Sequence, residues 1–551
     1  MRHFKRRISL SRVAFVIPEK GINAMLSVKG GRPLVNVILS MMEALGGSKT
    51  RNWARVIVLA LRKINLLYVQ MGAPGVIKYL YTCSVCLQQS IGGHVVPDIS
   101  AVKGIRVSRT DGGLPRIIPA GHRVAIRKDS FLTIRFWMTI FAIYRVIVIP
   151  SVAKLESITQ PGPQWEEMKY SHLYGKWLNA FKRAFVGRYR EVLKAPNPYP
   201  IYKASPNSVG RLFEVSTSIH ALYRSAVAWY HENNDKVVNA FLQLSLSDKF
   251  EKIRVSPILY ERRAHRLKES YATLSESLIA SLEMLHLHID EPDKVFGRDE
   301  LTDRSSQYRY IGKLGLKQEA AGKMRVFAMV DPWTQWLLRP LHDELFKILS
   351  RHKMDGTFNQ LRPLGRIPWG DRNLFSFDLS SATDRLPISL QVKIIASLYG
   401  DGFAEDWKTL LVGREYYLRM EDPRTGKKVR HSLRYAVGQP MGALSSWAML
   451  ALTHHYIVHV CAWAAGAVPV GKKFTEYAVL GDDILIWHPG VASWYQRIMS
   501  DLGVKIGLAK SLISPLGTAV EFAKRTLYKG VDVSPIPLKE LSSAHWSLGA
   551  A

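Results

Sequence analysis

Two acidic residues inside an otherwise apolar hairpin constrain this chain more than any other feature of its sequence. The runs Tyr477–Leu480 and Ile484–Trp487 have the composition of buried strands, and Gly481-Asp482-Asp483 joins them. A glycine followed by acids is typical of a tight turn, so the pattern predicts a β-hairpin. Carboxylates beside buried strands are unfavourable unless a cation lies between them. Taken alone, the triplet is an ordinary turn, and only its apolar setting makes it informative.

A third acid, Asp378, ends another apolar run. Leu374–Phe377 has strand composition, and a turn at 380–384 and a helix with Pro387 in its first turn follow it. If the two strand ends lie side by side, Asp378 and Asp482 form an oxygen site for two Mg²⁺ ions, and Mn²⁺ would also fit. Such a pair of ions supports phosphoryl transfer. Short strands that alternate with long helices over the last 200 residues predict an α+β or α/β core.

The charge of the chain indicates a polyanionic partner. Its 551 residues include 76 Lys and Arg against 45 Asp and Glu, a formal net charge of +31. Surplus cations repel one another, and their usual compensation is nucleic acid or an anionic membrane. Solubility or an organelle-wide basic bias is the alternative explanation. The nine basic residues between Lys103 and Arg145 form either a solvated face or a phosphate-tracking surface, and the sequence leaves both open.

Cysteines and apolar stretches exclude further classes of protein. Three cysteines cannot form a disulfide framework, and Cys83 and Cys86 have no second metal-binding pair, so we expect a buried thiol pair. The apolar stretches 132–150 and 449–470 contain arginines or histidines and are predicted to be buried helices, with no membrane span. The basic first eighteen residues suit a mitochondrial presequence or a basic arm equally.

Three strings occur in an order that is typical of one enzyme family. FSFDLSSATDRLP (375–387), GQPMGALSSWAMLALTHH (438–455) and YAVLGDDILIW (477–487) resemble motifs A, B and C of viral RNA-dependent RNA polymerases, most closely those of mitoviruses. Residues 319–325 with 328–331 resemble motif F, and 507–511 and 521–525 resemble motifs D and E. Residues 75–93 are also similar to mitoviral N-terminal sequence.

This resemblance implies a right-hand polymerase of the α+β class that replicates a viral RNA genome. It implies an N-terminal basic, mostly helical region (1–160), fingers (161–373) with a nucleotide-gripping basic loop at 317–325, and a palm (374–530) whose antiparallel sheet is flanked by helices. Part of 386–437 would belong to the fingers. Because only 26 residues follow 525, we expect a short thumb remnant (531–551), an incomplete C-terminus, or an N-terminal third that does the work of a thumb.

The resemblance also assigns the chemistry. Asp378 and Asp482 would bind the two Mg²⁺ ions, and Asp483 would support the second. Lys323 and Arg325 would hold the incoming triphosphate. Lys510 would protonate the departing pyrophosphate. Without the family, Lys323 and Arg325 belong to a solvated basic loop and Lys510 is a surface lysine.

Two further groups concern sugar choice and RNA. Asp384 would accept a hydrogen bond from the ribose 2′-OH, where reverse transcriptases have an aromatic residue nearby. Ser445 or Ser446 would replace the asparagine that many RNA polymerases use to bridge to this acid. Two groups of residues are expected to contact RNA. Gly438, Gln439 and Gly442 would form a loop whose backbone the template and the nascent base pair can approach closely. Lys524 and Arg525 would lie near the primer strand and its phosphates.

Two alternative functions stay open at this point. One is a reverse transcriptase or maturase-like enzyme, although Leu480-Gly481 before the acids lacks the aromatic residue usual there. The other is a catalytically inactive RNA-binding remnant of a viral polymerase. A P-loop enzyme is excluded because no GxxxxGK[ST] motif occurs. The expected partners are RNA template, nascent RNA and ribonucleoside triphosphates, and a monomer in the host mitochondrion is expected.

Overall fold

A four-stranded antiparallel sheet carries the predicted acidic strand ends. Its order is β10-β5-β9-β8. The strands are β5 (Leu374–Phe377), β8 (Tyr477–Leu480), β9 (Asp483–Ile486) and β10 (Leu512–Ser514). The predicted hairpin is confirmed, because Leu480 pairs with Asp483 across the two-residue turn Gly481-Asp482. Gly481 has a φ of +60°, a left-handed conformation that favours glycine.

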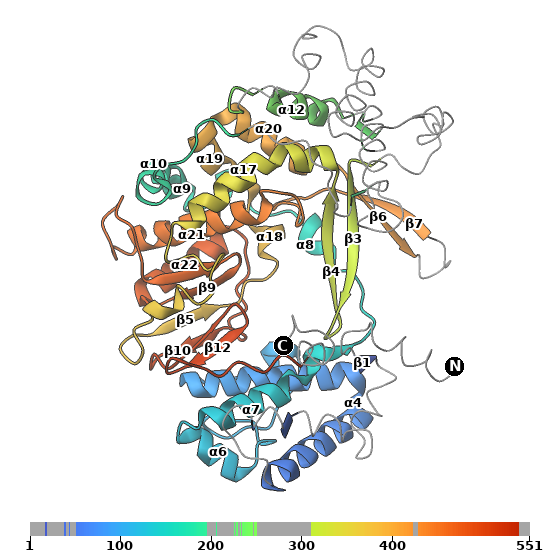
Figure 1. Cartoon of the computed structure of the whole chain (residues 1–551), viewed down its shortest axis with the longest axis vertical. Helices are drawn as coiled ribbons and strands as arrows, with labels where there is room; N and C mark the ends of the chain where they lie inside the picture. Colours follow the sequence, from blue (N-terminus) through green and yellow to red (C-terminus); the bar gives the residue numbers. More distant parts are fainter. Residues whose placement is uncertain are drawn as a thin grey trace.

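The computed structural model describes residues 51–194, 310–421 and 428–538, parts of 205–250, and a few residues before 51. Nearly all of the basic N-terminal arm, most of residues 210–290 and residues 539–551 lie outside the described residues. Within the described part the chain is a mixed α+β protein with several small sheets (Figure 1). The α+β expectation is thereby confirmed.

Helices cover the sheet on one side. α21 (Ser446–Ala464) and α22 (Pro489–Asp501) pack against each other and against β8 and β9 (Figure 1). Almost every residue of α21 is buried, including its three histidines, so the prediction of a buried helix there is confirmed. Further helices complete this body: α17 (Pro332–Ser350), α18 (Ala382–Arg385), α19 (Ile388–Tyr399), α20 (Asp401–Val412) and α12 (Asp235–Ser245).

Short helical segments connect the N-terminal part of the chain to this body. They are α8 (Glu156–Thr159), η3 (Trp165–Glu167), α9 (Ser171–Lys176), α10 (Leu178–Phe181) and η4 (Lys182–Val186). One more short segment, η5 (Leu364–Arg366), follows α17 later in the chain. α10 packs against α19, and Tyr174 on α9 donates a hydrogen bond to Asp501 at 2.7 Å. The connecting segment is therefore fixed to the helical body.

A second sheet contains a long hairpin. Its order is β4-β3-β6-β7, with β3 (Gly312–Glu319), β4 (Lys323–Val330), β6 (Tyr416–Glu421) and β7 (Lys428–Leu433). The expected basic loop 317–325 is thus mostly strand, and only residues 320–322 form the turn. Ala321 and Gly322 take positive φ there, and this tight reversal lets the ladder continue to Glu319 and Lys323.

A third, three-stranded sheet follows the first. It consists of β11 (Ala519–Phe522), β12 (Arg525–Tyr528) and β13 (Val531–Asp532), all antiparallel. β11 packs against β5, β9 and β10, so this sheet lies beside the acidic strand ends.

The described residues from 51 to 150, here called the N-terminal unit, are mostly helical. They contain α4 (Arg51–Gly92), α5 (Ser100–Lys103), α6 (Ala120–Arg127), α7 (Phe131–Phe141), the 3₁₀ helix η2 (Ala142–Val146) and β2 (Ile147–Val148), which pairs with β1 (Ile17–Pro18). α4 is kinked at Gly72, which has non-helical angles and precedes Pro74.

One helix prediction in this unit is wrong in part. The stretch 132–150 is buried as expected, but α7 ends at Phe141 and the chain becomes extended at Ile147. The β-branched run Ile147–Ile149 before Pro150 favours extended backbone, because a residue before proline avoids the helical region. Cys83 and Cys86 are free and buried on α4, as predicted.

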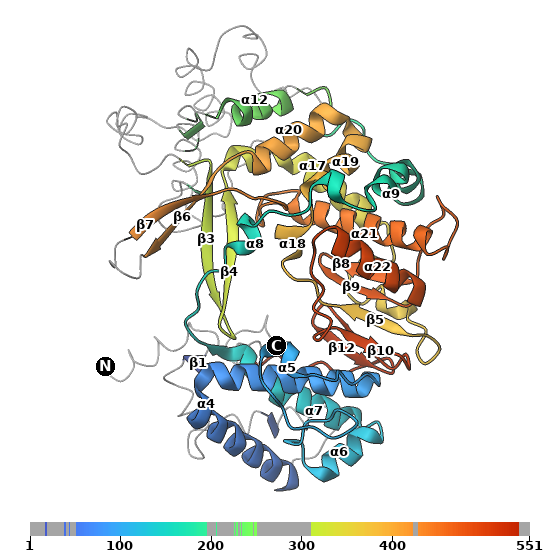
Figure 2. The same cartoon turned by 180° about the vertical axis from the view of Figure 1, so that it is seen from behind.

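The N-terminal unit joins two parts of the molecule that are far apart in Figures 1 and 2. At the tip of the β3–β4 hairpin, the Ala321 N–H donates to the Ile147 carbonyl at 2.7 Å. On the other side, Gln88 of α4 donates to Thr526 of β12 at 2.9 Å. Leu512, Ala519 and other residues of the C-terminal strands share one hydrophobic core with the N-terminal helices.

Among the described residues, one helix is long and apolar enough to cross a membrane. It is α4 over Asn52–Gly92, with a mean hydropathy of 1.4 in its most apolar window. Length and composition alone place it in this class, and core helices of soluble proteins share these properties. The break at Gly72 divides it into two shorter helices.

Candidate active site

The three predicted metal-binding acids gather at one edge of the first sheet. Phe377 lies opposite Ile484 in the antiparallel pair β5–β9. Asp378 directly follows β5, and Asp483 is the first residue of β9, so the register brings them side by side. Asp482 precedes Asp483 in the turn and is exposed. Sequence positions more than a hundred residues apart therefore meet, as the strand-end argument predicted.

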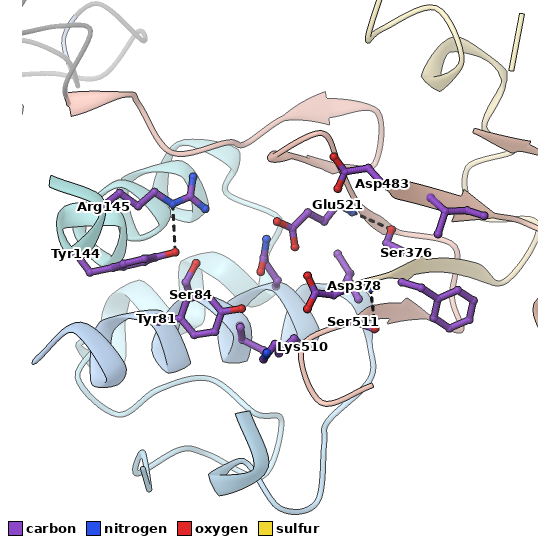
Figure 3. A pocket seen from close by; sticks show the side chains of 15 residues that line it. Tyr81, Ser84, Tyr144, Arg145, Ser376, Asp378, Asp483, Lys510, Ser511 and Glu521 are labelled. Atoms are coloured by element: carbon purple, nitrogen blue, oxygen red, sulfur yellow. Dashed lines mark hydrogen bonds between the residues drawn. The ribbon is translucent and has the colours of Figure 1, made fainter. Parts of the chain in front are cut away.

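A cavity of about 80 Å³ lies at this edge. Asp378, Asp483 and Glu521 line it, and their carboxylates project to the same side of the strands (Figure 3). Its opposite wall comes from the N-terminal unit, through Tyr81, Ser84, Val85 and Gln88 of α4 and Tyr144 and Arg145 of η2. The site is therefore built from both ends of the described chain.

The carboxylates strongly influence one another. Burial, together with the nearby charges of Asp482, Glu521 and Asp378, raises the pKa of Asp483 to about 7. Desolvation also raises the pKa of Asp378, although its side chain reaches solvent, and the charges of Lys510 and Lys323 oppose that rise. Crowded, poorly solvated carboxylates of this kind attract cations.

Glu521 was part of a recognised string, but the sequence did not mark it as a site residue. Burial raises its pKa, and the charge of Arg145 opposes the rise. Its backbone N–H donates to the Ser376 hydroxyl at 3.1 Å, which fixes β11 against β5. Arg145 in turn donates to the Tyr144 hydroxyl at 3.2 Å (Figure 3). Arg145 and Glu521 are 521 − 145 = 376 positions apart in the sequence. No local sequence pattern could therefore reveal that the charge of Arg145 acts on Glu521.

Backbone contacts fix the position of Asp378. Its N–H donates to the Ser511 hydroxyl at 3.1 Å, and its carbonyl accepts from the Gly507 N–H at 2.8 Å. A Cβ at Gly507 would lie 3.1 Å from the Asp378 Oδ2 atom and 3.5 Å from the Lys510 Cδ atom. Gly507 therefore leaves room for Asp378 and Lys510 to approach each other, and Lys510 lines the cavity as the family resemblance implied.

Buried histidines of α21 support the acidic turn. Burial lowers the pKa of His454 to about 4, so the ring is neutral at neutral pH. Its Nδ1 lies 2.8 Å from the Gly481 carbonyl and its Nε2 lies 2.7 Å from the Tyr495 hydroxyl. A neutral ring with hydrogen on Nδ1 donates to the carbonyl and accepts from the tyrosine. The sequence indicated that the histidine is buried, but not that it contacts the turn.

The predicted triphosphate-binding residues lie on β4. Lys323 is exposed and its charge acts on Asp378 across the space between the two sheets. Arg325 is two positions along the same strand and pairs with Glu319 at 2.9 Å. Of the two, only Lys323 is therefore free of an ion pair in the described part of the chain.

The Asp384 carboxylate accepts a hydrogen bond from a serine, but this serine is neither Ser445 nor Ser446. Ser157 of α8 donates to its Oδ2 atom at 2.7 Å, whereas burial raises the pKa of this acid. Among the described contacts, Ser445 and Ser446 do not bridge to Asp384. Ser445 accepts from the Trp407 indole at 3.0 Å and Ser446 is 2% exposed at the start of α21. In this structure the serine that contacts Asp384 therefore comes from α8, which packs against α18, and a bridge from motif B stays a prediction.

The glycines of the loop 438–442 let other backbone segments approach it closely, and in this structure those segments belong to the protein itself. A Cβ at Gly438 would lie 2.2 Å from the Thr383 carbonyl oxygen, and one at Gly442 would lie 2.2 Å from the Ala328 carbonyl oxygen. Gln439 is fully buried and donates to Gln391 at 2.7 Å. Contact between RNA and this loop stays a prediction.

The two expected primer-binding residues lie at the β11–β12 turn. Lys524 is exposed at its tip with a φ of +63°, and its charge opposes the rise of the Asp483 pKa. Arg525 is held by Asp532 at 2.8 Å. Lys524 is therefore the one of the two that faces the acids without an ion pair among the described residues.

The site fits Mg²⁺ that is bound partly by the carboxylates and partly by substrate phosphates. In the described part of the chain, no three His, Cys, Asp or Glu side chains already form a metal-binding group. Mg²⁺ commonly binds through one or two carboxylates, waters and substrate phosphates rather than an all-protein cage. Asp378 and Asp483, with Asp482 adjacent, supply such hard oxygen donors, and their raised pKa values indicate that positive charge is in short supply.

Comparisons with known proteins support the family resemblance. A sequence model described as mitovirus RNA-dependent RNA polymerase matches residues 193–548. The chain is 44% identical over 219 residues to the RNA-directed RNA polymerase of Cryphonectria parasitica mitovirus 1, covering 39% of this chain and 25% of that protein.

Two uncharacterized mitochondrial proteins of Arabidopsis thaliana are also similar. One is 41% identical over 165 residues, which cover 30% of this chain and 77% of the relative. The other is 35% identical over 205 residues, which cover 37% of this chain and 79% of the relative. The matched region thus spans most of each plant protein but only about a quarter of the viral polymerase.

Proposed function

Because the chain belongs to the mitovirus RNA-dependent RNA polymerase family, we propose that it is an RNA-directed RNA polymerase. It would copy viral RNA by transferring nucleotides from ribonucleoside triphosphates to an RNA 3′-OH. The observation that carries this proposal is the meeting of Asp378 with Asp482 and Asp483 at neighbouring strand ends, beside a carboxylate-lined cavity. Host mitochondria are the proposed location, and the two plant mitochondrial relatives support it.

The proposed architecture is a right hand. Residues 374–530 would form the palm, with part of 386–437 contributing to fingers at 161–373. The long β3–β4 hairpin would be the finger element that carries the nucleotide-binding cations. Residues 1–160 would form the remaining N-terminal region, and 531–551 would belong to the thumb. The hydrogen bonds of the N-terminal unit to both the hairpin tip and β12 support the idea that it does the work of a thumb.

Asp378 and Asp482 would hold two Mg²⁺ ions, or Mn²⁺, with Asp483 supporting the second. When bound, these ions would activate the attacking hydroxyl and offset charge on the leaving oxygen. Asp378 is held in place for this by Ser511 and Gly507, and the acidic turn by His454. Rigid backbone contacts of this kind keep the carboxylates preorganised.

The chain's own cations would act on the phosphates. Lys323 and Arg325 would bind the triphosphate, with Arg325 exchanging Glu319 for phosphate oxygens. The Lys510 Nζ atom would give a proton to the departing pyrophosphate, since its ammonium lines the cavity next to Asp378.

Asp384 would select ribose, and Lys524 would contact RNA. With Ser157 donating to one of its oxygens, Asp384 retains acceptor capacity for a 2′-OH. Arg525, Gly438, Gln439 and Gly442 would contribute to the RNA path through the conformation of their loops, and Ser445 and Ser446 to the shape of the nucleotide site. The partners are therefore RNA template, nascent RNA and ribonucleotides, bound by a monomer.

The test is primer extension by the purified full chain with Mg²⁺, a short RNA template and ribonucleotides. The wild-type protein should extend RNA, and Asp482→Asn should lower the rate on the order of a thousandfold, because a metal ligand is lost. RNA affinity should stay within about twofold, since this acid does not bind phosphates. Asp371→Asn, which removes an exposed acid just before β5, is the matched control and should leave the rate unchanged.

Two results would contradict the proposal. A wild-type protein that binds RNA without extending it would be the inactive remnant considered from the sequence. Equal use of deoxynucleotides and ribonucleotides would contradict the role of Asp384 and favour the reverse transcriptase alternative.

A further inference from the structure

The N-terminal unit supplies side chains to the wall of the carboxylate cavity. Tyr81, Tyr144 and Arg145 all line it (Figure 3). These residues precede residue 193, where the match to the family model begins. The family comparison therefore assigns them no role, and the structure alone raises the question of what this wall contributes.

The short helix α5 holds a lysine at this wall. α5 ends at Lys103, and Gly104 closes it in a left-handed conformation with its N–H on the Ser100 carbonyl at 2.6 Å. Ile99 and Val102 are buried against Val85 and Cys86 of α4. The helix is short, but its packing fixes the direction in which it ends.

The same small cluster ties α5 to the segment that carries Lys510. Ala509 packs against these buried residues, and its carbonyl accepts from the Gln89 side chain at 2.9 Å. Lys510 is the next residue and lines the cavity. α5 and the Lys510 segment are therefore held at a fixed separation by α4.

Lys103 lies beside the wall of the cavity, next to the lining residue Tyr81. Its Nζ lies 5.1 Å from the centroid of the Tyr81 ring, and that ring lines the cavity. The side chain is exposed, and its electrostatic neighbours include Lys510, Lys323 and Asp378. Burial by the surrounding wall and the charges of Lys510 and Lys323 lower the pKa of Lys103.

The ammonium groups of Lys103, Lys323 and Lys510, from three distant segments, thus all act electrostatically on the Asp378 carboxylate. None of them has an ion-pair partner within 4 Å in the described part of the chain. Like charges gathered in this way repel one another, so the arrangement is favourable only when a polyanion is bound. A phosphodiester in RNA brings one charge per phosphate, whereas a triphosphate or pyrophosphate brings several charges to one place, which matches three converging cations better.

We propose that Lys103 binds the oligophosphate group of the substrate, together with Lys323 and Lys510. It would contact the triphosphate of the incoming ribonucleotide and the pyrophosphate released from it. This assignment rests on the proposed polymerase function and adds a residue from outside the matched region. It also separates Lys103 from the rest of the 103–145 basic run, for which the sequence left open a solvated face or a phosphate-tracking surface.

The test compares Lys103→Gln with Lys103→Arg and with Lys63→Gln, an exposed lysine on α4 away from the cavity. Lys103→Gln should raise the KM for ribonucleotides about tenfold, because one charge-assisted contact is lost. The kcat at saturating nucleotide should change less than threefold, and RNA affinity should not change. Inhibition by pyrophosphate should weaken by a similar factor.

The two control variants should behave differently from Lys103→Gln. Lys103→Arg should retain most of the affinity for ribonucleotides, and Lys63→Gln should resemble the wild type.

A second measurement does not depend on turnover. Inorganic tripolyphosphate should displace a fluorescent ATP analogue from the full chain, and Lys103→Gln should weaken the displacement about tenfold. This result would stand even if the wild-type protein failed to extend RNA, so failure of the proposed function is distinguishable. Equal tripolyphosphate affinity in Lys103→Gln and Lys63→Gln would overturn the proposal. A loss of RNA affinity with unchanged KM would overturn it too and assign Lys103 to the RNA backbone.

Discussion

Asp483 is the acid whose surroundings differ most from water. It lies at the start of β9, between the turn residue Asp482 and the side chains of Asp378 and Glu521. The sequence marked it as a supporting metal ligand because it follows Asp482. Its pKa is raised first by burial and then by the charges of the adjacent Asp482 and of Glu521 and Asp378 from other segments, so only part of the cause is local in the sequence.

The same surroundings give a prediction about stability. The pKa of Asp483 is about 7 in the folded chain, against an ordinary value near 4, so the folded state holds its proton more tightly than the unfolded state. Stability should therefore fall as pH rises from about 4 to about 7, and the penalty is complete above pH 7. In metal-free protein at pH 8, Asp483→Asn should raise the free energy of unfolding by about 2–4 kcal/mol.

Denaturant unfolding in EDTA measures this difference. It should shrink toward zero near pH 4, where the acid is protonated in both states, and Mg²⁺ should stabilise the wild type more than the variant. Asp371→Asn serves as the control and should give no pH-dependent gain. A gain that is independent of pH would mean that packing, and not the carboxylate charge, limits stability here.

Elements show where local patterns were sufficient. The β8–β9 hairpin and the burial of α21 follow directly from alternating turn residues and apolar runs. The expected basic loop 317–325 was wrong in form, because cross-strand pairing extends the ladder to Lys323. The stretch 132–150 was wrong in its second half, where a β-branched run before proline ends the helix.

The loop before α21 carries a prediction at this scale. Gly438 lies so close to the motif A turn that a Cβ would overlap the Thr383 and Asp384 backbone, at 2.2 Å and 2.5 Å. Gly438→Ala should therefore lower the free energy of unfolding by about 1–3 kcal/mol and displace Asp384. Thermal or urea unfolding would measure the change.

Gly402→Ala is the matched control for that variant. Gly402 lies in α20 and has open space where a Cβ would go. Alanine there should be neutral or stabilise the helix by up to about 1 kcal/mol. Equal effects of the two substitutions would contradict the close approach described for the loop.

At the scale of the whole molecule, the net charge of +31 is spread over parts that meet around the site. Lys323 comes from the long hairpin, Lys524 from the third sheet, and Lys103 from the N-terminal unit. The N-terminal unit shares its hydrophobic core with the C-terminal strands, so these two described parts depend on each other for their structure.

The charge excess predicts a steep salt dependence of RNA binding. Each phosphate neutralised on a single strand contributes a slope of about −0.7 to the logarithm of affinity against the logarithm of salt. With about six contacts, affinity should fall roughly a hundredfold or more between 50 and 200 mM salt. Fluorescence anisotropy with a short RNA and the Asp482→Asn protein would measure it without turnover. A flat response would separate the net charge from RNA binding.

The sequence by itself determined the α+β class, the acidic hairpin and the order of the family motifs, because each depends on residues close together in the chain. Only the tertiary structure decided that Glu521 and Arg145 line the cavity, that Ser157 rather than a motif B serine contacts Asp384, and that Lys103 lies over the ring of the lining residue Tyr81. The physical reason is that desolvation, charge and hydrogen bonding act over a few ångströms in space. Here those distances join segments separated by hundreds of positions in the chain.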